Sequence, residues 1–146
     1  HERPRPRRAR RVPRDGGGAV VIFGIGTDIV RVARMQKNIE RYGEKFAERI
    51  LTPAELSEYR KESRQAHFLA KRFAAKEAAA KAMGTGFRDG LMLHHIGVTH
   101  DAAGKPQLAF TDQAAEFVQA NRITSVHVSL ADEEDHAVAF VTLATG

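Results

Sequence analysis

The sequence predicts an α+β domain in which a mostly antiparallel sheet packs with a helical block around one long helix. Residues 19–25 are apolar, rich in β-branched side chains and interrupted or followed by glycine, as in a buried strand. Residues 63–83 are rich in alanine and long enough to form the central helix. Residues 125–130 and 136–143 are strand-like segments on either side of an acidic turn, which is typical of a hairpin.

Three shorter helices are expected between the first strand and the long helix. The first would be capped by Thr27 or Asp28 and would end near residue 42. Residues 44–51 supply another one or two helical turns, and the third helix begins with Thr52 as its cap, has a proline at its first position and ends near residue 61.

The long helix is expected to end at the glycines of the segment Gly84-Thr85-Gly86. Its helical repeat gathers one set of residues on a face toward the core, with Glu77 and Lys81 at the edge of that face. The core-facing set is Leu69, Phe73, Lys76, Ala80 and Met83.

The second half of the chain is expected to contain four strands and one helix. Strands at 96–100 and 106–110 are joined by a turn, and Thr111 caps a helix that ends near residue 121. Residues 137–143 are apolar on both faces of the last strand. Helices or a neighbouring subunit should therefore cover both sides of the sheet.

The charge of the chain is concentrated at its N-terminus. The net charge is +5, and residues 1–15 supply it with seven arginines against Glu2 and Asp15, so that the remainder is neutral. We expect residues 1–18 to form a disordered basic tail, followed by one domain over residues 19–146. The tail is either an extension without a role or an arm that contacts nucleic acid or anionic lipid.

Two features of the composition exclude classes of protein. The chain has no apolar run approaching the roughly 20 residues that a membrane-spanning helix needs. It also has no cysteine, which excludes disulfides and thiolate metal sites. We expect a soluble, cytoplasmic protein without a membrane partner.

The first candidate for chemistry is Asp28, in the segment Gly-Ile-Gly-Thr-Asp directly after the first strand. The two glycines resemble the start of a dinucleotide-binding fingerprint, but Ile29 stands where the third glycine is required and no βαβ repeat follows. Asp28 is therefore either a helix cap or a carboxylate at a site where small residues allow a ligand to approach the backbone.

Glu77 and Lys81 are the second candidate. Their spacing of four residues is typical of a helix-stabilising ion pair, but the neighbouring alanines leave space beside the carboxylate for a hard cation. Asp28 and Glu77 together would supply two oxygen ligands for Mg²⁺, and Lys81 would face the phosphates of a substrate. This combination favours phosphate transfer over sugar hydrolysis, because the chain has no tryptophan and only two tyrosines for a sugar cleft.

Five segments resemble the holo-[acyl-carrier-protein] synthase family of 4′-phosphopantetheinyl transferases in order and spacing, and the resemblance covers residues 20–144. Two features depart from the family pattern: the arginine-rich tail, and Arg31, which stands where the family often has glutamate. The segments are IFGIGTDIVRVARM, FAERILTPAEL, FLAKRFAAKEAAAKAMGTG, GKP and VHVSLADEEDHAVAFV.

The resemblance implies a Mg²⁺-dependent enzyme of fatty-acid synthesis. Such an enzyme moves the phosphopantetheine arm of coenzyme A to a serine of apo acyl carrier protein and releases 3′,5′-ADP. It implies Asp28 and Glu77 as metal ligands and Lys81 as the lysine that contacts the reacting phosphate. Glu77, Asp28 or a metal-bound water could accept the serine proton. The resemblance also implies a homotrimer with active sites between subunits.

Further residues are assigned by the same resemblance. For His127, strand alternation places it with Ser129 on the face opposite Val126. The four histidines at 94, 95, 100 and 136 lack the spacing of a zinc site and are expected to be solvated. The residues expected to bind coenzyme A are Arg72, Lys81, Gly84, Gly86, Gly104, Lys105, Pro106 and His127. Those expected to dock an acidic carrier protein are Arg34, Arg41 and Lys45, in a basic stripe with Arg31 and Lys37.

Two alternatives remain. A nucleic-acid-binding module would use the basic tail, although the neutral body and the acidic turn at residues 131–135 oppose it. Removing residues 1–18 would abolish such binding but leave a transferase active. The second alternative is a transferase of the same fold that modifies carrier domains of polyketide or nonribosomal synthases, although those relatives are longer chains.

Overall fold

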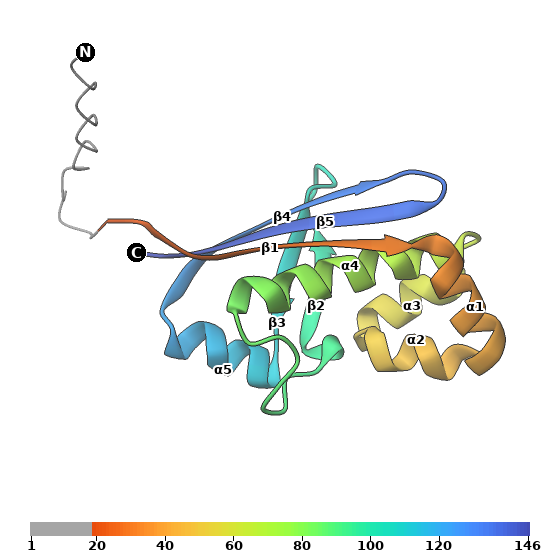
Figure 1. Cartoon of the computed structure of the whole chain (residues 1–146), viewed down its shortest axis with the longest axis horizontal. Helices are drawn as coiled ribbons and strands as arrows, with labels where there is room; N and C mark the ends of the chain where they lie inside the picture. The colour runs from red at the N-terminus through yellow and green to blue at the C-terminus, as the bar shows by residue number, and fades with distance from the viewer. Residues whose placement is uncertain (1–18) are drawn as a thin grey trace, which may run out of the picture.

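The computed structural model describes residues 19–146 and shows an α+β domain with two antiparallel sheets (Figure 1). The predicted fold class is confirmed, whereas the expected tail at residues 1–18 lies outside the described residues. The helices are α1 (Val32–Tyr42), α2 (Glu44–Ile50), α3 (Pro53–Lys61), α4 (Gln65–Met83) and α5 (Asp112–Ala120), with a short 3₁₀ helix η1 (Leu93–His95). The strands are β1 (Val21–Arg31), β2 (Ile96–His100), β3 (Pro106–Phe110), β4 (Ile123–Asp132) and β5 (His136–Thr145).

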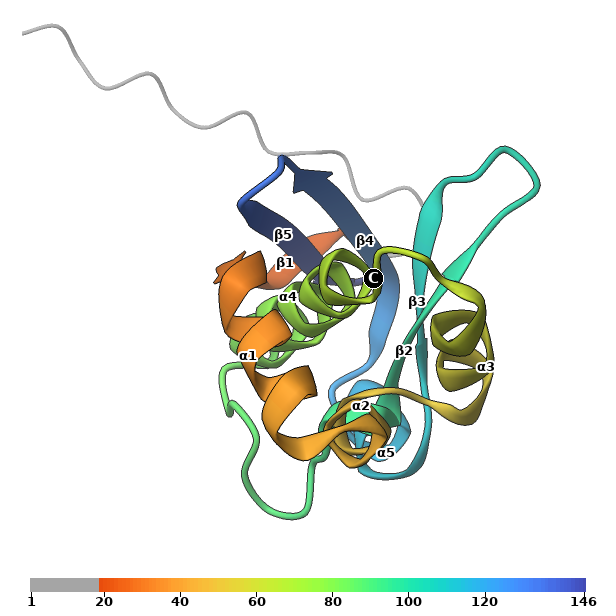
Figure 2. The same cartoon turned by 90° about the vertical axis from the view of Figure 1, so that its right-hand side faces the viewer.

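The larger sheet has the strand order β1-β5-β4, and α4 lies along one of its faces (Figure 1). The helices α1, α2 and α3 gather near one end of α4, and α5 lies near the other. The smaller sheet is the hairpin of β2 and β3, which stands on the β4 side of the domain and next to α3 (Figure 2). No helix among residues 19–146 is long and apolar enough to cross a membrane.

The backbones of β1 and α4 lie unusually close together. A Cβ atom added at Gly26 would overlap the carbonyl oxygen of Ala78 and lie 2.7 Å from the amide nitrogen of Ala82. A Cβ atom at Gly24 would overlap the carbonyl oxygen of Ala82. Glycine on the strand and alanine on the helix are therefore the residues that this approach allows.

The alanines of α4 are part of this contact, which corrects their predicted role. Ala74, Ala75, Ala78 and Ala79 are fully buried against the rest of the domain. They do not leave an open surface beside Glu77, as the sequence had indicated. Instead, their small side chains allow the helix to bury most of its circumference.

The first strand is longer than predicted, and Asp28 is not a helix cap. β1 pairs with β5 as far as Arg31, which lies opposite His136, and Asp28 lies opposite Ala139. The helix α1 begins only at Val32, whose amide donates to the carbonyl of Asp135 at 2.9 Å. The long-range ladder with β5 satisfies the backbone groups that a local helix would otherwise have used.

The predicted start of α3 and the predicted end of α4 are confirmed, whereas the predicted side-chain cap of α5 is wrong. Thr52 and Glu55 form a complete capping box at the start of α3, with the Thr52 hydroxyl accepting from the Glu55 amide at 3.2 Å. α4 ends at Gly84, which adopts a left-handed conformation with φ of 81°. Thr111 stands at the cap position of α5, but its hydroxyl donates to the carbonyl of His95 at 3.4 Å instead of capping the helix.

Residues 19–146 cover only one face of the larger sheet. α4 covers the face that contains Val141 and Leu143 of β5, both fully buried. The opposite face, which we call the open face, presents Ile25, Ile29 and Phe140, which are 59%, 64% and 44% exposed. None of the helices α1 to α5 covers this face.

Candidate active site

Asp28 and Lys81 meet where β1 crosses α4, although 53 residues separate them in the sequence. The Lys81 ammonium lies 3.1 Å from Oδ1 of Asp28 and donates to the Thr27 carbonyl at 2.9 Å. The Asp28 side chain is 16% exposed, whereas that of Lys81 is 54% exposed. The carboxylate is therefore held at the edge of the core, and the ammonium remains accessible to a ligand.

Glu77 belongs to the same group of charges. It precedes Lys81 by one helical turn, and burial raises the pKa of its carboxyl. Repulsion by the Asp28 carboxylate raises this pKa further, while Lys81 and Arg34 act in the opposite direction. Asp28 and Glu77 thus lie close enough to repel each other, so that a cation between them would relieve an unfavourable interaction.

A direct salt bridge between Glu77 and Lys81, the ordinary helical ion pair, is not formed within residues 19–146. Among the described residues, the salt-bridge partner of Lys81 is Asp28, not Glu77. Glu77 is half-buried and has no salt bridge to a cation in the described part of the chain. No group of three or more histidine or acidic side chains within residues 19–146 is arranged to hold a metal ion. A site for Mg²⁺ commonly has only one or two carboxylates, and water and substrate oxygens occupy the other positions.

Arg34 lies beside this group of charges, but the predicted basic stripe is divided. The Arg34 guanidinium is 5.4 Å from the centre of the Phe73 ring on α4. Lys45 lies apart on α2, where it lines a different cavity with Arg49 and His94. A groove of about 580 Å³ is lined by Arg31, Ala33, Arg34, Lys37, Asn38 and Arg41.

Most residues predicted to bind coenzyme A lie away from Asp28 within one chain. His127 is exposed on the open face of β4, and its ring nitrogen Nε2 lies 3.1 Å from the Ser125 hydroxyl. Asp28 points to the other face of the same sheet, toward α4. The segment 104–106 lies at the tip of the hairpin of β2 and β3, at the β4 side. Gly84 and Gly86 follow the C-terminus of α4, beyond Lys81, and both have positive φ.

Arg72 lies in a buried ionic cluster that the sequence analysis missed. The cluster consists of Glu55, Arg72 and Lys76, which are 1%, 6% and 0% exposed. Burial lowers the pKa of Lys76, and the Glu55 carboxylate opposes that change. The capping-box glutamate at 55 and the lysine on the core face of α4 were both visible in the sequence. Nothing in the sequence showed that they would meet.

The prediction of solvated histidines is wrong for His95. This side chain is 7% exposed, and its Nδ1 accepts a hydrogen bond from the Met92 amide at 3.1 Å. Its ring also packs edge-on against that of His94, with 4.8 Å between centres. The compact turn of η1 folds this side chain back over its own backbone, which the spacing of histidines in the sequence does not reveal.

Comparison with known proteins identifies the family of this chain. The family model described as the 4′-phosphopantetheinyl transferase superfamily matches residues 24–141. A holo-[acyl-carrier-protein] synthase from Halorhodospira halophila is 53% identical over 126 residues, which is 86% of this chain and 100% of that protein. One from Hamiltonella defensa is 54% identical over 122 residues, covering 84% of this chain and 97% of that protein.

Solved structures give the same result. The holo-[acyl-carrier-protein] synthase of Neisseria meningitidis aligns with a TM-score of 0.80 and 45% identity, covering 84% of this chain and 98% of that one. The enzyme of Bacillus anthracis, solved in complex with coenzyme A (3′,5′-ADP), aligns with a TM-score of 0.72 and 37% identity, covering 88% and 100%. The chain therefore belongs to the holo-[acyl-carrier-protein] synthase family within the 4′-phosphopantetheinyl transferase superfamily.

Proposed function

We propose that this chain transfers the 4′-phosphopantetheine group of coenzyme A to a serine hydroxyl of apo acyl carrier protein. The products are holo acyl carrier protein and 3′,5′-ADP, and the reaction requires Mg²⁺ and serves fatty-acid synthesis in the cytoplasm. The observation that supports this function is the meeting of Asp28, Glu77 and Lys81 where β1 crosses α4. The named activity of the relatives supplies the substrates.

Asp28 and Glu77 are the residues that would hold Mg²⁺. Their carboxylates fit a hard divalent cation because both offer oxygen ligands and because they repel each other in its absence. When bound, Mg²⁺ would withdraw negative charge from the pyrophosphate of coenzyme A. The exposed Lys81 ammonium would contact the oxygens of the phosphate that is attacked, where negative charge rearranges during the transfer.

Glu77 is also suited to accept the proton of the serine hydroxyl. Burial and Asp28 raise the pKa of its carboxyl in the metal-free protein, whereas a bound cation would lower it and keep the carboxylate ionised, as a proton acceptor must be. Lys81 and Arg34 oppose this rise and so help to keep the carboxylate ionised. The serine oxygen would then attack the β-phosphorus, its bond to phosphorus would form as the bond to the leaving 3′,5′-ADP oxygen breaks, and the electron pair would leave with 3′,5′-ADP.

Lys81→Ala should lower kcat by about 100-fold and change KM for coenzyme A by less than about threefold, because its contact strengthens in the transition state. Steady-state kinetics with varied coenzyme A would measure both constants. Lys61→Ala, at the exposed end of α3, is the control for removing a surface lysine and should change neither. A raised KM with unchanged kcat would contradict the role of Lys81 in the chemical step.

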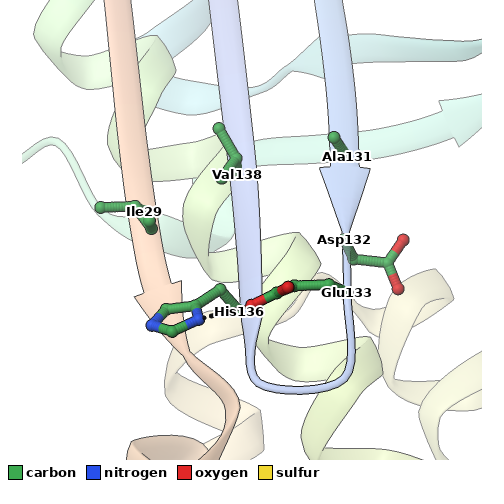
Figure 3. Close-up of a pocket in the computed structure, with 6 residues that line it drawn as sticks. All are labelled: Ile29, Ala131, Asp132, Glu133, His136 and Val138. Carbon is green, nitrogen blue, oxygen red and sulfur yellow. Dashed lines mark hydrogen bonds and ion pairs between the residues drawn. The ribbon is translucent and has the colours of Figure 1, made fainter.

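We propose that a homotrimer completes the site. Asp28 and His127 lie on opposite faces of the larger sheet, so that a single chain cannot place both side chains against one ligand. The open face also has a cavity of about 300 Å³ near the turn between β4 and β5 (Figure 3). Ile29 and Val138 lie on its wall, and His136 lies 2.9 Å from a Glu133 carboxylate oxygen. Exposed apolar side chains of this kind are typical of a subunit interface.

Carrier-protein docking is proposed for the groove around Arg34. Arg34→Ala and Arg41→Ala should each raise KM for acyl carrier protein about fivefold at low salt, because opposite charges guide and orient the encounter. The effect should shrink as added salt screens these exposed charges.

Only Arg34→Ala should also lower kcat, since Arg34 alone of the two acts on Glu77. Lys45→Ala, on the neighbouring helix, tests whether docking extends beyond the groove. An unchanged KM in both arginine variants would place docking elsewhere.

The proposed reaction is tested by incubating the protein with coenzyme A, Mg²⁺ and an apo acyl carrier protein. Mass spectrometry should show a gain of about 340 Da on the carrier protein, which is the mass of the transferred group in this phosphoryl-transfer chemistry. Apo carrier domains of polyketide and nonribosomal synthases, used in parallel, would show whether the fatty-acid carrier is preferred. A folded protein that modifies none of these carriers would overturn the proposal.

A further inference from the structure

One edge of β2 is occupied by charged side chains instead of a strand. β2 pairs with β3 on one side, and its other edge faces α3 and α4. On that edge, the Val98 amide donates to Oε2 of Glu55 at 3.1 Å, and the Val98 carbonyl accepts from Nη1 of Arg72 at 2.8 Å. The Ile96 carbonyl accepts from the Lys76 ammonium. Three side chains thus satisfy backbone groups that a neighbouring strand would otherwise bond.

Within the ionic cluster, both carboxylate oxygens of Glu55 accept hydrogen bonds. Oε1 of Glu55 accepts from Nζ of Lys76 at 2.6 Å and from the Thr52 amide at 2.9 Å. Oε2 accepts from Arg72 at 3.4 Å in addition to the Val98 amide. No buried side-chain nitrogen or oxygen atom lacks a partner within residues 19–146. Burying three charges is costly, and apolar residues can often replace such a cluster without loss of stability. The cluster therefore calls for an explanation beyond stability.

The turn at the tip of the hairpin of β2 and β3 is stabilised by hydrogen bonds within the turn. Oδ1 of Asp101 accepts from the amides of Ala103 and Lys105, each at 2.9 Å. The tip, which is exposed, extends away from the body of the domain (Figure 2). Its orientation is therefore determined at the base of the hairpin, where Ile96 and Val98 bond to α3 and α4.

We propose that Glu55, Arg72 and Lys76 are positioning residues that orient the hairpin of β2 and β3 so that Gly104-Lys105-Pro106 contacts coenzyme A. This inference rests on the proposed function, because the role of the tip in binding coenzyme A belongs to it. The helix α4 supplies Arg72 and Lys76 as well as Glu77 and Lys81. The hairpin is thus fixed to the same rigid helix that packs along the larger sheet.

Glu55→Gln removes the charge that joins the cluster to β2 but preserves the size of the side chain. KM for coenzyme A should rise about tenfold, with kcat changed less than about twofold, since the chemical groups stay in place. Amide hydrogen exchange of residues 96–110 should accelerate at the same time. Glu58→Gln is the matched control, because Glu58 pairs with Arg72 at 3.1 Å but is 54% exposed, and its side-chain bond in the described residues is to Arg72 and not to β2. It should change neither quantity.

A double variant separates positioning from stability. Glu55→Gln with Lys76→Met removes two of the three buried charges and leaves Arg72 paired with Glu58, so that the free energy of unfolding should recover relative to the single variant. The bonds of Glu55 and Lys76 to Ile96 and Val98 are still lost or weakened, and KM should stay raised. A stable double variant with the wild-type KM would overturn the proposal.

Measurements on the unaltered protein keep the test decisive if the variants do not fold. The amide of Val98 should exchange only as fast as global unfolding allows, because the cluster holds this edge of β2. Exchange by local opening of the hairpin would overturn the positioning role. If the unaltered protein fails to bind coenzyme A, the proposed function fails, whereas a normal unaltered protein with an unaffected Glu55→Gln variant refutes the positioning role alone.

Discussion

Glu77→Gln should reduce phosphopantetheine transfer by about 1,000-fold or more, because it removes one of two carboxylates available to the metal and the proposed proton acceptor. Glutamine retains the shape of the side chain, so that the packing of α4 against β1 should persist. Transfer is measured by the mass gain of the carrier protein under single-turnover conditions. Glu116→Gln, at an exposed position of α5, is the control for neutralising a surface carboxylate and should retain full activity.

The same variant should not be less stable than the wild-type protein in metal-free buffer. Because the pKa of Glu77 is raised on folding, the folded state binds this proton more tightly than the unfolded chain does. The contribution of Glu77 to stability therefore decreases as pH rises from the ordinary carboxyl range through the raised pKa. Glutamine removes this penalty at neutral pH. Denaturant unfolding at pH 7 would compare the free energy of unfolding of Glu77→Gln with that of the wild-type protein. Near-normal phosphopantetheine transfer by Glu77→Gln would contradict the proposed role of Glu77 in the active site.

Gly26→Ala should destabilise the domain by about 3 kcal/mol, or lower Tm by about 10 °C, because the added methyl group overlaps backbone atoms that cannot rotate away. The overlapping atom is the carbonyl oxygen of Ala78, and the Ala82 amide lies 2.7 Å from the added carbon. Either β1 separates from α4 or the ladder between β1 and β5 bends. Both responses would also move Asp28 relative to Glu77, so that transfer should fall with stability.

Gly84→Ala provides the comparison for a glycine that is needed only for its backbone conformation. No atom lies within 4 Å of a Cβ atom added there, but φ is 81°. It should cost about 1 kcal/mol, the usual penalty for placing a side chain in the left-handed region. Thermal unfolding of both variants measures the difference. Equal losses of stability in Gly26→Ala and Gly84→Ala would mean that the close packing of β1 on α4 contributes little to the stability of the domain.

These two glycines illustrate which features can be predicted from local sequence. The C-terminus of α4 at Gly84 and the capping box at Thr52 were predicted because a helix end is determined by residues within one turn. The strands at 96–100 and 106–110 were predicted with their observed bounds, since alternation and a turn between them are also local. Gly26 was recognised only as a small residue, and its contact with Ala78 was not predicted.

The candidate site divides in the same way. The residue types suited to Mg²⁺ and phosphate were identifiable from motif spacing, and the structure brings Asp28, Glu77 and Lys81 together. The predicted cap at Asp28 was wrong because pairing with β5 extends β1 to Arg31. The assignments of His127 and of residues 104–106 to coenzyme A stay predictions, as does Arg72, whose guanidinium is bonded to Val98 and Glu58.

The amino-acid order was thus sufficient for the number of helices and for most of their bounds, apart from the start of α1. It was also sufficient for most strand positions, the family resemblance and the acidic and basic residues of the proposed site. Folding in three dimensions was needed to pair Lys81 with Asp28, to bury Glu55, Arg72 and Lys76 together, and to place His127 and Asp28 on opposite faces of one sheet. The reason is physical. Caps, turns and alternation depend on neighbours along the chain, whereas buried ion pairs and the two faces of a sheet depend on contacts between segments that approach only when the core forms.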